Sequence, residues 1–401
     1  MVVTMKKLLL IDPNFPHPKK SVNHQDILPV GLLKIGAYYK SKGWEVVLQR
    51  LCENQEKLDY EPNKIMVTSL YTYWSKYVRD AVVFAKENYD APVEVGGVFA
   101  SLQPQLCKEV TGCDSVHIGI VDGAEDMIPD YSLLNEEPSF QVLHTTRGCT
   151  RRCKVCGVYC IEPHFTYRDS IKDLVFKRKL VFYDNNLLAN PNIENILREL
   201  IILKKNRTIL HCESQSGFDG RILRKKPYLA KMLKQSGFVY PKIAWDGSVK
   251  SWKNREKEVE ILADEYKRSH ISVFMLLNHE QPFEELERKR LYCWKWGVQI
   301  GNCRYRPLDA LYDNYNGRRK NQTNDDYFIH PNWTDREIKQ FNSNVRKHNL
   351  CIRFRLNYHS PTIEKKKLPF DLHKELKFAS YEQASDVLED CWNPNEYHGV
   401  E

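Results

Sequence analysis

Hydrophobic runs and helical periodicity alternate along the first 120 residues. Short apolar runs of the kind that form buried strands occupy residues 7–12, 45–49, 64–70, 93–97 and 115–120. Apolar residues recur at helical spacing in 30–42 and 76–86, and Gly43 ends the first of these helices. Such alternation favours a parallel sheet with helices on both faces. Residues 1–128 are therefore predicted to form an α/β domain with a doubly wound, Rossmann-like sheet.

The pattern restarts after a polar stretch, residues 129–140, which contains two prolines and several acidic residues and predicts an exposed linker. From 141 to 315, strand and helix repeat six times. The predicted strands are 142–146, 180–183, 208–213, 242–245, 272–277 and 298–305, and the helices between them include 193–205, 222–235, 255–268 and 283–296. Six such units predict a partial (βα)6, TIM-like barrel, whose chemistry would lie at the carboxyl ends of its strands.

Residues 316–401 differ in character from the preceding segment. Residues 318–326 are polar, and a helix is predicted for 335–349 with Thr334 as its N-cap. A second helical stretch is predicted at 380–388. These features predict a small, mainly helical C-terminal extension that closes the barrel over a substrate.

Composition narrows the class of protein. With 401 residues, of which 42% are hydrophobic, the chain can build the cores of two domains. No apolar run approaches the roughly 18 residues of a membrane span, and the N-terminus lacks the apolar segment of a signal peptide. Twelve cysteines are too few for a disulfide scaffold and gather around residue 149, which favours a metal site in a reducing compartment. We therefore expect a cytoplasmic protein without membrane contact.

The net charge of +8 permits a nucleic-acid partner, although its only support is the excess of lysine and arginine. The alternative is that these basic groups form solvated surfaces. Composition does not decide between the two.

The predicted first strand of the barrel leads into a loop that contains Cys149, Cys153 and Cys156. The spacing Cys-x3-Cys-x2-Cys can direct three thiolates at one small volume. Three protein ligands leave one iron of a 4Fe-4S cluster open to a small chelating molecule. A structural zinc site usually has four ligands in two separated pairs, and the second pair is missing here. In the alternative, Cys160 is a fourth ligand and closes the site.

This cysteine loop resembles that of the radical S-adenosylmethionine (SAM) superfamily. The resemblance implies that Cys149, Cys153 and Cys156 hold a 4Fe-4S cluster and that the amino and carboxylate groups of SAM bind the open iron. It also implies a one-electron donor of the flavodoxin or ferredoxin type. Reductive cleavage of SAM would then yield a 5'-deoxyadenosyl radical that abstracts hydrogen from an unactivated carbon of an unknown substrate.

The resemblance further implies cofactor contacts at the carboxyl ends of the predicted barrel strands. Asp184 and its two neighbours would accept hydrogen bonds from the SAM ammonium group, and Arg304 would pair with the carboxylate. Val155 would pack on the adenine, and Glu213 would bind the ribose hydroxyls or the methionine end. The implied contacts are Val155, Asp184, Asn185, Asn186, Glu213, Asp246 and Arg304. In the alternative, these side chains form a polar network that serves the barrel itself.

The stretches 29–33, 95–102 and 117–130 resemble the N-terminal cobalamin-binding-type domain of one radical SAM subgroup. Residues 68–74, 183–191, 217–221 and 304–311 are similar to an uncharacterised branch of that subgroup, so the resemblance covers about residues 6 to 315 and names no substrate. The Asp-x-His-x-x-Gly signature of many cobalamin proteins is absent. In such a domain, 12–17, 69–74 and 96–101 would meet a ligand.

Three functions follow as alternatives from this resemblance. The first is cobalamin-dependent C-methylation. The second is cobalamin-free rearrangement or oxidoreduction, including modification of a nucleic-acid base. The third is a non-catalytic iron-sulfur binding module.

Overall fold

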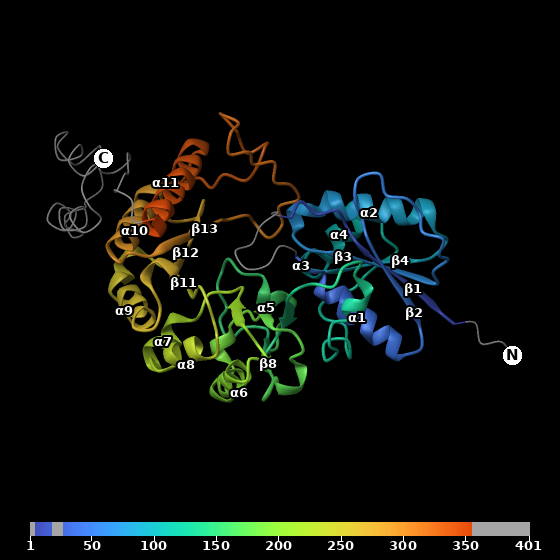
Figure 1. Ribbon diagram of the computed structural model, residues 1–401. Coiled ribbons are helices and arrows are strands. Elements are labelled where there is room, and N and C mark those ends of the chain that lie inside the picture. The colour runs from blue at the N-terminus through green and yellow to red at the C-terminus, as the bar shows by residue number, and fades with distance from the viewer. Residues whose placement is uncertain (1–4, 18–26, 355–401) are drawn as a thin grey trace.

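A computed structural model describes residues 5–17 and 27–354 (Figure 1). The chain is mixed α/β with parallel sheets, and its first part contains a five-stranded parallel sheet in the order β2-β1-β3-β4-β5. Its strands are β1 (Lys7–Asp12), β2 (Glu45–Arg50), β3 (Lys64–Ser69), β4 (Val93–Gly97) and β5 (Ser115–Val116). This arrangement confirms the α/β class predicted for the first part and is consistent with a Rossmann-like sheet.

Helices cover both faces of this sheet (Figure 1). Helix α1 (Val30–Ser41) lies on one face, while α2 (Ser75–Asn88) and α4 (Pro104–Thr111) lie on the other, beside the short helices η1 (Thr72–Trp74) and α3 (Val98–Leu102). Leu8 and Leu10 of β1 belong to the core on the α1 face, and Leu9 and Ile11 belong to the core on the α2 face. Strand β1 is consequently buried on both sides.

The second part contains six parallel strands that follow one another in chain order. One sheet has the order β10-β9-β6 and the other β11-β12-β13. Two isolated parallel bridges, Cys212 with Phe238 and Phe218 with Ile243, link β10 and the segments around it to β11. The strands are β6 (Gln141–Leu143), β9 (Lys179–Phe182), β10 (His211–Ser214), β11 (Lys242–Ala244), β12 (Ser272–Leu277) and β13 (Gln299–Arg304). A barrel built from them stays a prediction.

Helices follow one another along the outer side of these strands (Figure 1). They are α6 (Ile193–Lys205), α7 (Gly220–Lys225), α8 (Leu229–Gln235), α9 (Trp252–Ala263), α10 (Phe283–Lys295) and α11 (Asp335–Phe354). The single helix predicted for 222–235 is two helices, because Pro227 interrupts it. The predicted cap of α11 is confirmed, since Thr334 Oγ1 accepts from the Glu337 amide (3.3 Å) and the Glu337 carboxylate accepts from the Thr334 amide (2.7 Å).

The connection between the two parts is more buried than its sequence predicts. Residues 129–140 contain η2 (Tyr131–Leu133), and Tyr131 and Phe140 are buried in the core of the α1 face with Val142 of β6. The Tyr131 hydroxyl accepts a hydrogen bond from the Val142 amide (2.9 Å).

The remaining short elements are β7 (Thr146–Arg147), α5 (Val158–Ile161), β8 (Thr166–Tyr167), η3 (Lys172–Leu174), η4 (Leu187–Ala189), η5 (Val249–Ser251) and η6 (Arg268–His270).

The predicted helical stretch 380–388 lies outside the described residues. Within residues 5–17 and 27–354, no helix combines the length and the apolar character needed to cross a membrane.

Candidate functional site

The cysteine loop is bracketed by an antiparallel pair of short strands at the carboxyl end of β6. Strands β7 and β8 pair Thr146 with Tyr167 and Arg147 with Thr166, so the chain returns to its starting point after the loop. Gly148 has φ +70°, and a Cβ atom there would lie 2.5 Å from the carbonyl oxygen of His164. The loop can therefore begin this tightly only because residue 148 is glycine.

Cys149, Cys153 and Cys156 are half-buried in this loop, whereas Cys160 is exposed on α5. Burial raises the pKa of Cys156; the Val158 backbone amide opposes this shift, and the other three thiols add to it through charge repulsion. The other three thiols are thus close enough to Cys156 for their charges to affect its pKa.

The donor set suits an iron-sulfur cluster, because thiolates are the ligands that such clusters require. As placed, however, no group of three or more His, Cys, Asp or Glu side chains among the described residues could hold a metal ion. Binding a cluster would require the thiols to converge further. The chemistry of the loop fits the cluster, and the convergence stays a prediction.

Asp184, which follows β9, is fully buried beside the base of the loop. Its Oδ1 accepts four hydrogen bonds, from the amides and the hydroxyls of Thr145 and Thr146, at 2.6 to 2.9 Å. Desolvation nevertheless raises the pKa of Asp184, against the effect of these bonds. Its Oδ2 is buried without a hydrogen-bond partner among the residues described. One oxygen therefore fixes the backbone before the cysteine loop, and the other is an available acceptor.

The two asparagines that follow Asp184 connect three loops. Asn185 donates to Glu162 (3.3 Å), at the end of the cysteine loop, and Asn186 donates to Asp219 (3.3 Å), beyond β10. Arg151 of the cysteine loop also reaches Asp219, at 3.9 Å. Asn186 Oδ1 is a second buried acceptor without a partner in the described part of the chain. The loops after β6, β9 and β10 consequently meet at one place, as the sequence predicts for the carboxyl ends of parallel strands.

The other predicted contacts lie in different surroundings. Glu213 is buried and pairs with Lys242 of β11 at 3.1 Å, and Val155 is half-buried in the loop. Asp246 is exposed, yet protein packed around it raises the pKa of its carboxyl, an effect opposed by the charges of Lys289 and Arg151. Asp246 therefore lies within electrostatic reach of the cysteine loop.

Arg304 is already engaged in the structure. Its guanidinium donates to Asp313 (2.7 Å) and lies over the rings of Tyr315 (4.5 Å) and Tyr327 (5.0 Å). Strand alternation places it on the face of β13 that carries Asn302, which bonds to Asn342 of α11. Arg304 thus belongs to the contact between β13 and the C-terminal segment, and its Nη1 is buried without a hydrogen-bond partner among the described residues.

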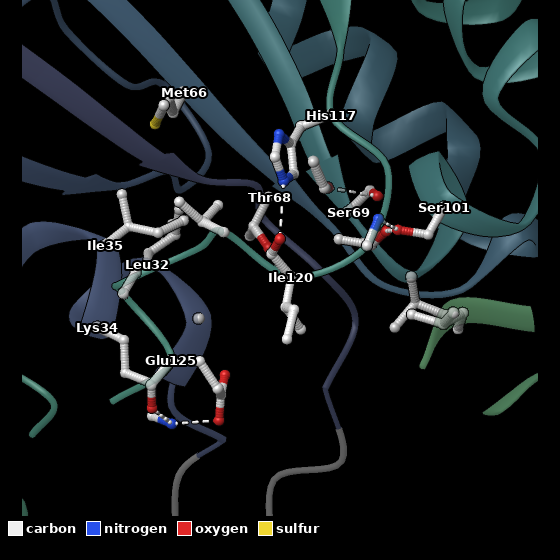
Figure 2. A pocket seen from close by; sticks show the side chains of 18 of the residues that line it. Leu32, Lys34, Ile35, Met66, Thr68, Ser69, Ser101, His117, Ile120 and Glu125 are labelled. Atoms are coloured by element: carbon white, nitrogen blue, oxygen red, sulfur yellow. Dashed lines mark hydrogen bonds and ion pairs between the residues drawn. The ribbon is translucent and has the colours of Figure 1, made fainter. Parts of the chain in front are cut away.

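A cavity of about 250 Å³ lies at the carboxyl edge of the N-terminal sheet (Figure 2). Its walls include α1 and the segments that follow β3, β4 and β5, so it meets two of the three stretches predicted to contact a ligand there, 69–74 and 96–101. The Ser101 hydroxyl donates to the Gly97 carbonyl (2.8 Å) and accepts from the Gly119 amide (2.9 Å). His117 shares a 3.2 Å hydrogen bond with the Ile120 carbonyl.

A second cavity, of about 530 Å³, shares Ile120, Glu125 and Arg147 with the first. The sequence by itself does not single out Glu125 or Glu162 as site residues. In the structure, Arg147 pairs with both carboxylates, at 3.3 Å and 2.7 Å. No local motif announces these contacts, since Glu125 lies outside the loop and Glu162 ends it. The N-terminal cavity and the cysteine loop share these residues.

No family model matches the chain, and no curated protein matches its sequence.

Proposed function

We propose that the chain is a radical SAM enzyme built on a partial (βα)6 barrel, with an N-terminal domain of the cobalamin-binding type. One observation carries the proposal. The Cys149, Cys153 and Cys156 loop follows the first of six parallel strands that run in chain order, and the buried acceptors Asp184 and Asn186 follow the second. A ligand held by the loop would lie beside acceptors that have no protein partner among the described residues.

The protein's part in this chemistry is to bind, orient and exclude water. Cys149, Cys153 and Cys156 would hold the 4Fe-4S cluster, which when bound supplies the electron that cleaves SAM. The free oxygens of Asp184 and Asn186 would orient the ammonium group of SAM. Arg151, held at Asp219, would place a positive charge beside the thiolates.

The function is tested by anaerobic reconstitution with iron and sulfide, followed by reduction in the presence of SAM. The native chain is expected to bind about four irons and to release 5'-deoxyadenosine. Cys153→Ala should abolish both iron binding and the release of 5'-deoxyadenosine. Cys160→Ala, the matched control on the exposed thiol, should preserve both. A cluster-loaded native chain that releases no 5'-deoxyadenosine would instead support the non-catalytic iron-sulfur module. Loss of activity in Cys160→Ala would identify a fourth ligand and remove the open iron.

Cobalamin-dependent C-methylation is a second candidate, favoured by the cavity at the carboxyl edge of the N-terminal sheet, where such folds bind ligands. Incubation with hydroxocobalamin and gel filtration should leave a cobalamin absorbance with the chain, and turnover should yield S-adenosylhomocysteine. A chain that binds no cobalamin but cleaves SAM would favour rearrangement or oxidoreduction, on a metabolite or a nucleic-acid base.

A further inference from the structure

Four charged side chains form a continuous chain from helix α1 to the cysteine loop. Lys34 Nζ lies 2.6 Å from Glu125 Oε1, Arg147 Nε lies 3.3 Å from the same oxygen, and Arg147 Nη2 lies 2.7 Å from Glu162 Oε1. Lys34 also donates to the Glu125 carbonyl (2.8 Å), and Figure 2 shows its pairing with Glu125. Side-chain exposure is between 9% and 23% along the chain, so water screens these pairs less than pairs at the surface.

The last member of this chain, Glu162, holds the cysteine loop closed. Its second oxygen, Oε2, accepts from the Gly148 amide (2.5 Å) and from Asn185 Nδ2 (3.3 Å). Gly148 directly precedes Cys149, and Glu162 comes two residues after Cys160. A single carboxylate thus joins the two ends of the loop to each other, to Arg147 and to the segment after β9.

We propose that Glu162 is a positioning residue that fixes Gly148, and with it Cys149, and that Lys34, Glu125 and Arg147 tie this position to the N-terminal sheet. The effect on a cluster rests on the function proposed above, but the effect on the loop does not. Cys149 follows Gly148 directly, so a shift of the Gly148 amide moves the first thiol. Because Gly148 has a positive φ, other residue types adopt its backbone conformation only with strain.

The same four residues line the 250 Å³ cavity. An occupant of that cavity would therefore touch the side chains that hold the loop. The N-terminal sheet accordingly contributes to the geometry of the cysteine site through defined ion pairs as well as through general packing.

The test uses Glu162→Gln, which keeps an acceptor for the Gly148 amide but removes the charge that binds Arg147. Its matched control is Glu136→Gln, an exposed glutamate of the connection between the two parts. In the full chain without iron, Glu162→Gln should speed hydrogen exchange of amides 148–162 and alkylation of Cys149. Alkylation of Cys303, an exposed thiol on β13, should not change in either variant. After reconstitution, iron should be held about 10- to 100-fold more weakly against a chelator, the range for residues that orient metal ligands.

The outcomes separate the loop role from the proposed function. Unchanged exchange and unchanged Cys149 alkylation in Glu162→Gln, and equally in Glu162→Ala, which also removes the acceptor for the Gly148 amide, would overturn the positioning role. Equal acceleration at Cys303 would overturn it too, because it would mean general loosening. Faster exchange in a chain that never takes up iron would support the positioning role and refute the proposed function. Glu125→Gln tests the tie to the N-terminal sheet: a smaller acceleration confined to 148–162 supports it, and no change overturns it.

Discussion

Strand β12 is more apolar in sequence than β1, yet it is less buried. In β1, all residues from Leu8 to Asp12 are buried. In β12, buried and half-buried residues alternate, with Val273, Met275 and Leu277 packed against the helices. The reason is that helices cover both faces of the N-terminal sheet, whereas strands β12 and β13 are covered by helices along one side; β6 and β9 are covered on their other face by the core of the α1 face. Hydrophobicity alone does not reveal how many faces of a strand are covered.

This difference explains where polar chemistry can reside. The less covered face of β13 bears the exposed side chain of Cys303, opposite Arg304, whereas Glu213 of β10 is buried against Lys242 of β11. In the N-terminal sheet a cavity lies at the carboxyl edge, where the strands end. The first part is thus a closed scaffold with a cavity at its carboxyl edge, whereas β12 and β13 leave one face less covered.

Glycine substitutions test this contrast most strongly. Gly97 has φ +99°, and an added Cβ would lie 2.2 Å from the Ser69 carbonyl oxygen, which is backbone and cannot move aside. Gly97→Ala should cost roughly 3–5 kcal/mol through strain and overpacking. At Gly301 the added Cβ would meet the half-buried ring of Phe274, at 2.3 Å, which can rotate away. Gly301→Ala should cost about 1 kcal/mol, and urea denaturation of both variants would measure the two costs.

Equal costs would contradict the contrast, because they would mean that the second part is packed as rigidly as the first. A reversed order would place the closed scaffold in the second part.

A pair of leucine truncations tests the same contrast in the strands. Leu10 of β1 is fully buried, and Leu276 of β12 is half-buried on the face away from the helices. Leu10→Ala should cost about 2–4 kcal/mol, because it removes burial and leaves a cavity, and Leu276→Ala about 1 kcal/mol. Denaturant unfolding measures both values. If Leu276→Ala cost more than Leu10→Ala, the face of β12 that bears Leu276 would be covered after all.

The sequence predicts the helices and strands well where a run of neighbouring residues determines them. The bounds of four elements coincide with the predicted ranges: β1, β4, β12 and α6. Strand β5 is shorter than predicted, and the connection 129–140 is partly buried, because Tyr131 and Phe140 pack on a core formed by distant segments. Pairings between distant residues were not predictable: Lys34 and Glu125 are 91 positions apart, and Asp184 is 38 positions from Thr146.

Substitution of Asp184 separates a scaffold role from a ligand role in the second part. Asp184→Ala would leave four donors without their acceptor and should cost about 2–3 kcal/mol. Asp184→Asn keeps Oδ1 and replaces the oxygen that lacks a partner, so the free energy of unfolding should change by less than about 1 kcal/mol. The new amide would present a donor where an acceptor stood. SAM binding to the reconstituted chain, measured by equilibrium dialysis, should therefore weaken in Asp184→Asn; unchanged binding would restrict Asp184 to the scaffold.

Acid titration tests the covered face of the second part, where the effect is absent at pH 8 and grows step by step as the pH falls. His348 of α11 is buried behind β13, where its Nε2 bonds to the Val298 carbonyl (2.8 Å). Burial, and to a smaller extent the charge of Arg290, lowers the pKa of His348 to about 3, against the effect of the hydrogen bond to Val298. In the unfolded chain His348 has a pKa near 6.5. Between about pH 6.5 and pH 3 it is therefore protonated in the unfolded chain and neutral in the native chain. As pH falls from about 6.5 towards 3, this residue should reduce the free energy of unfolding by up to about 1.4 kcal/mol per pH unit.

His348→Gln keeps a donor for the Val298 carbonyl and removes the titrating group. At pH 8 both chains are neutral at this position in either state, so any difference in urea denaturation there measures packing alone. Below pH 6.5 the curve of the variant should fall less steeply than that of the native chain, by one proton. Parallel curves from pH 8 to pH 4 would mean that water reaches the imidazole in the native state. In that case the helix layer behind β13 would be open, and the distinction between a covered and an uncovered face of the second part would fail.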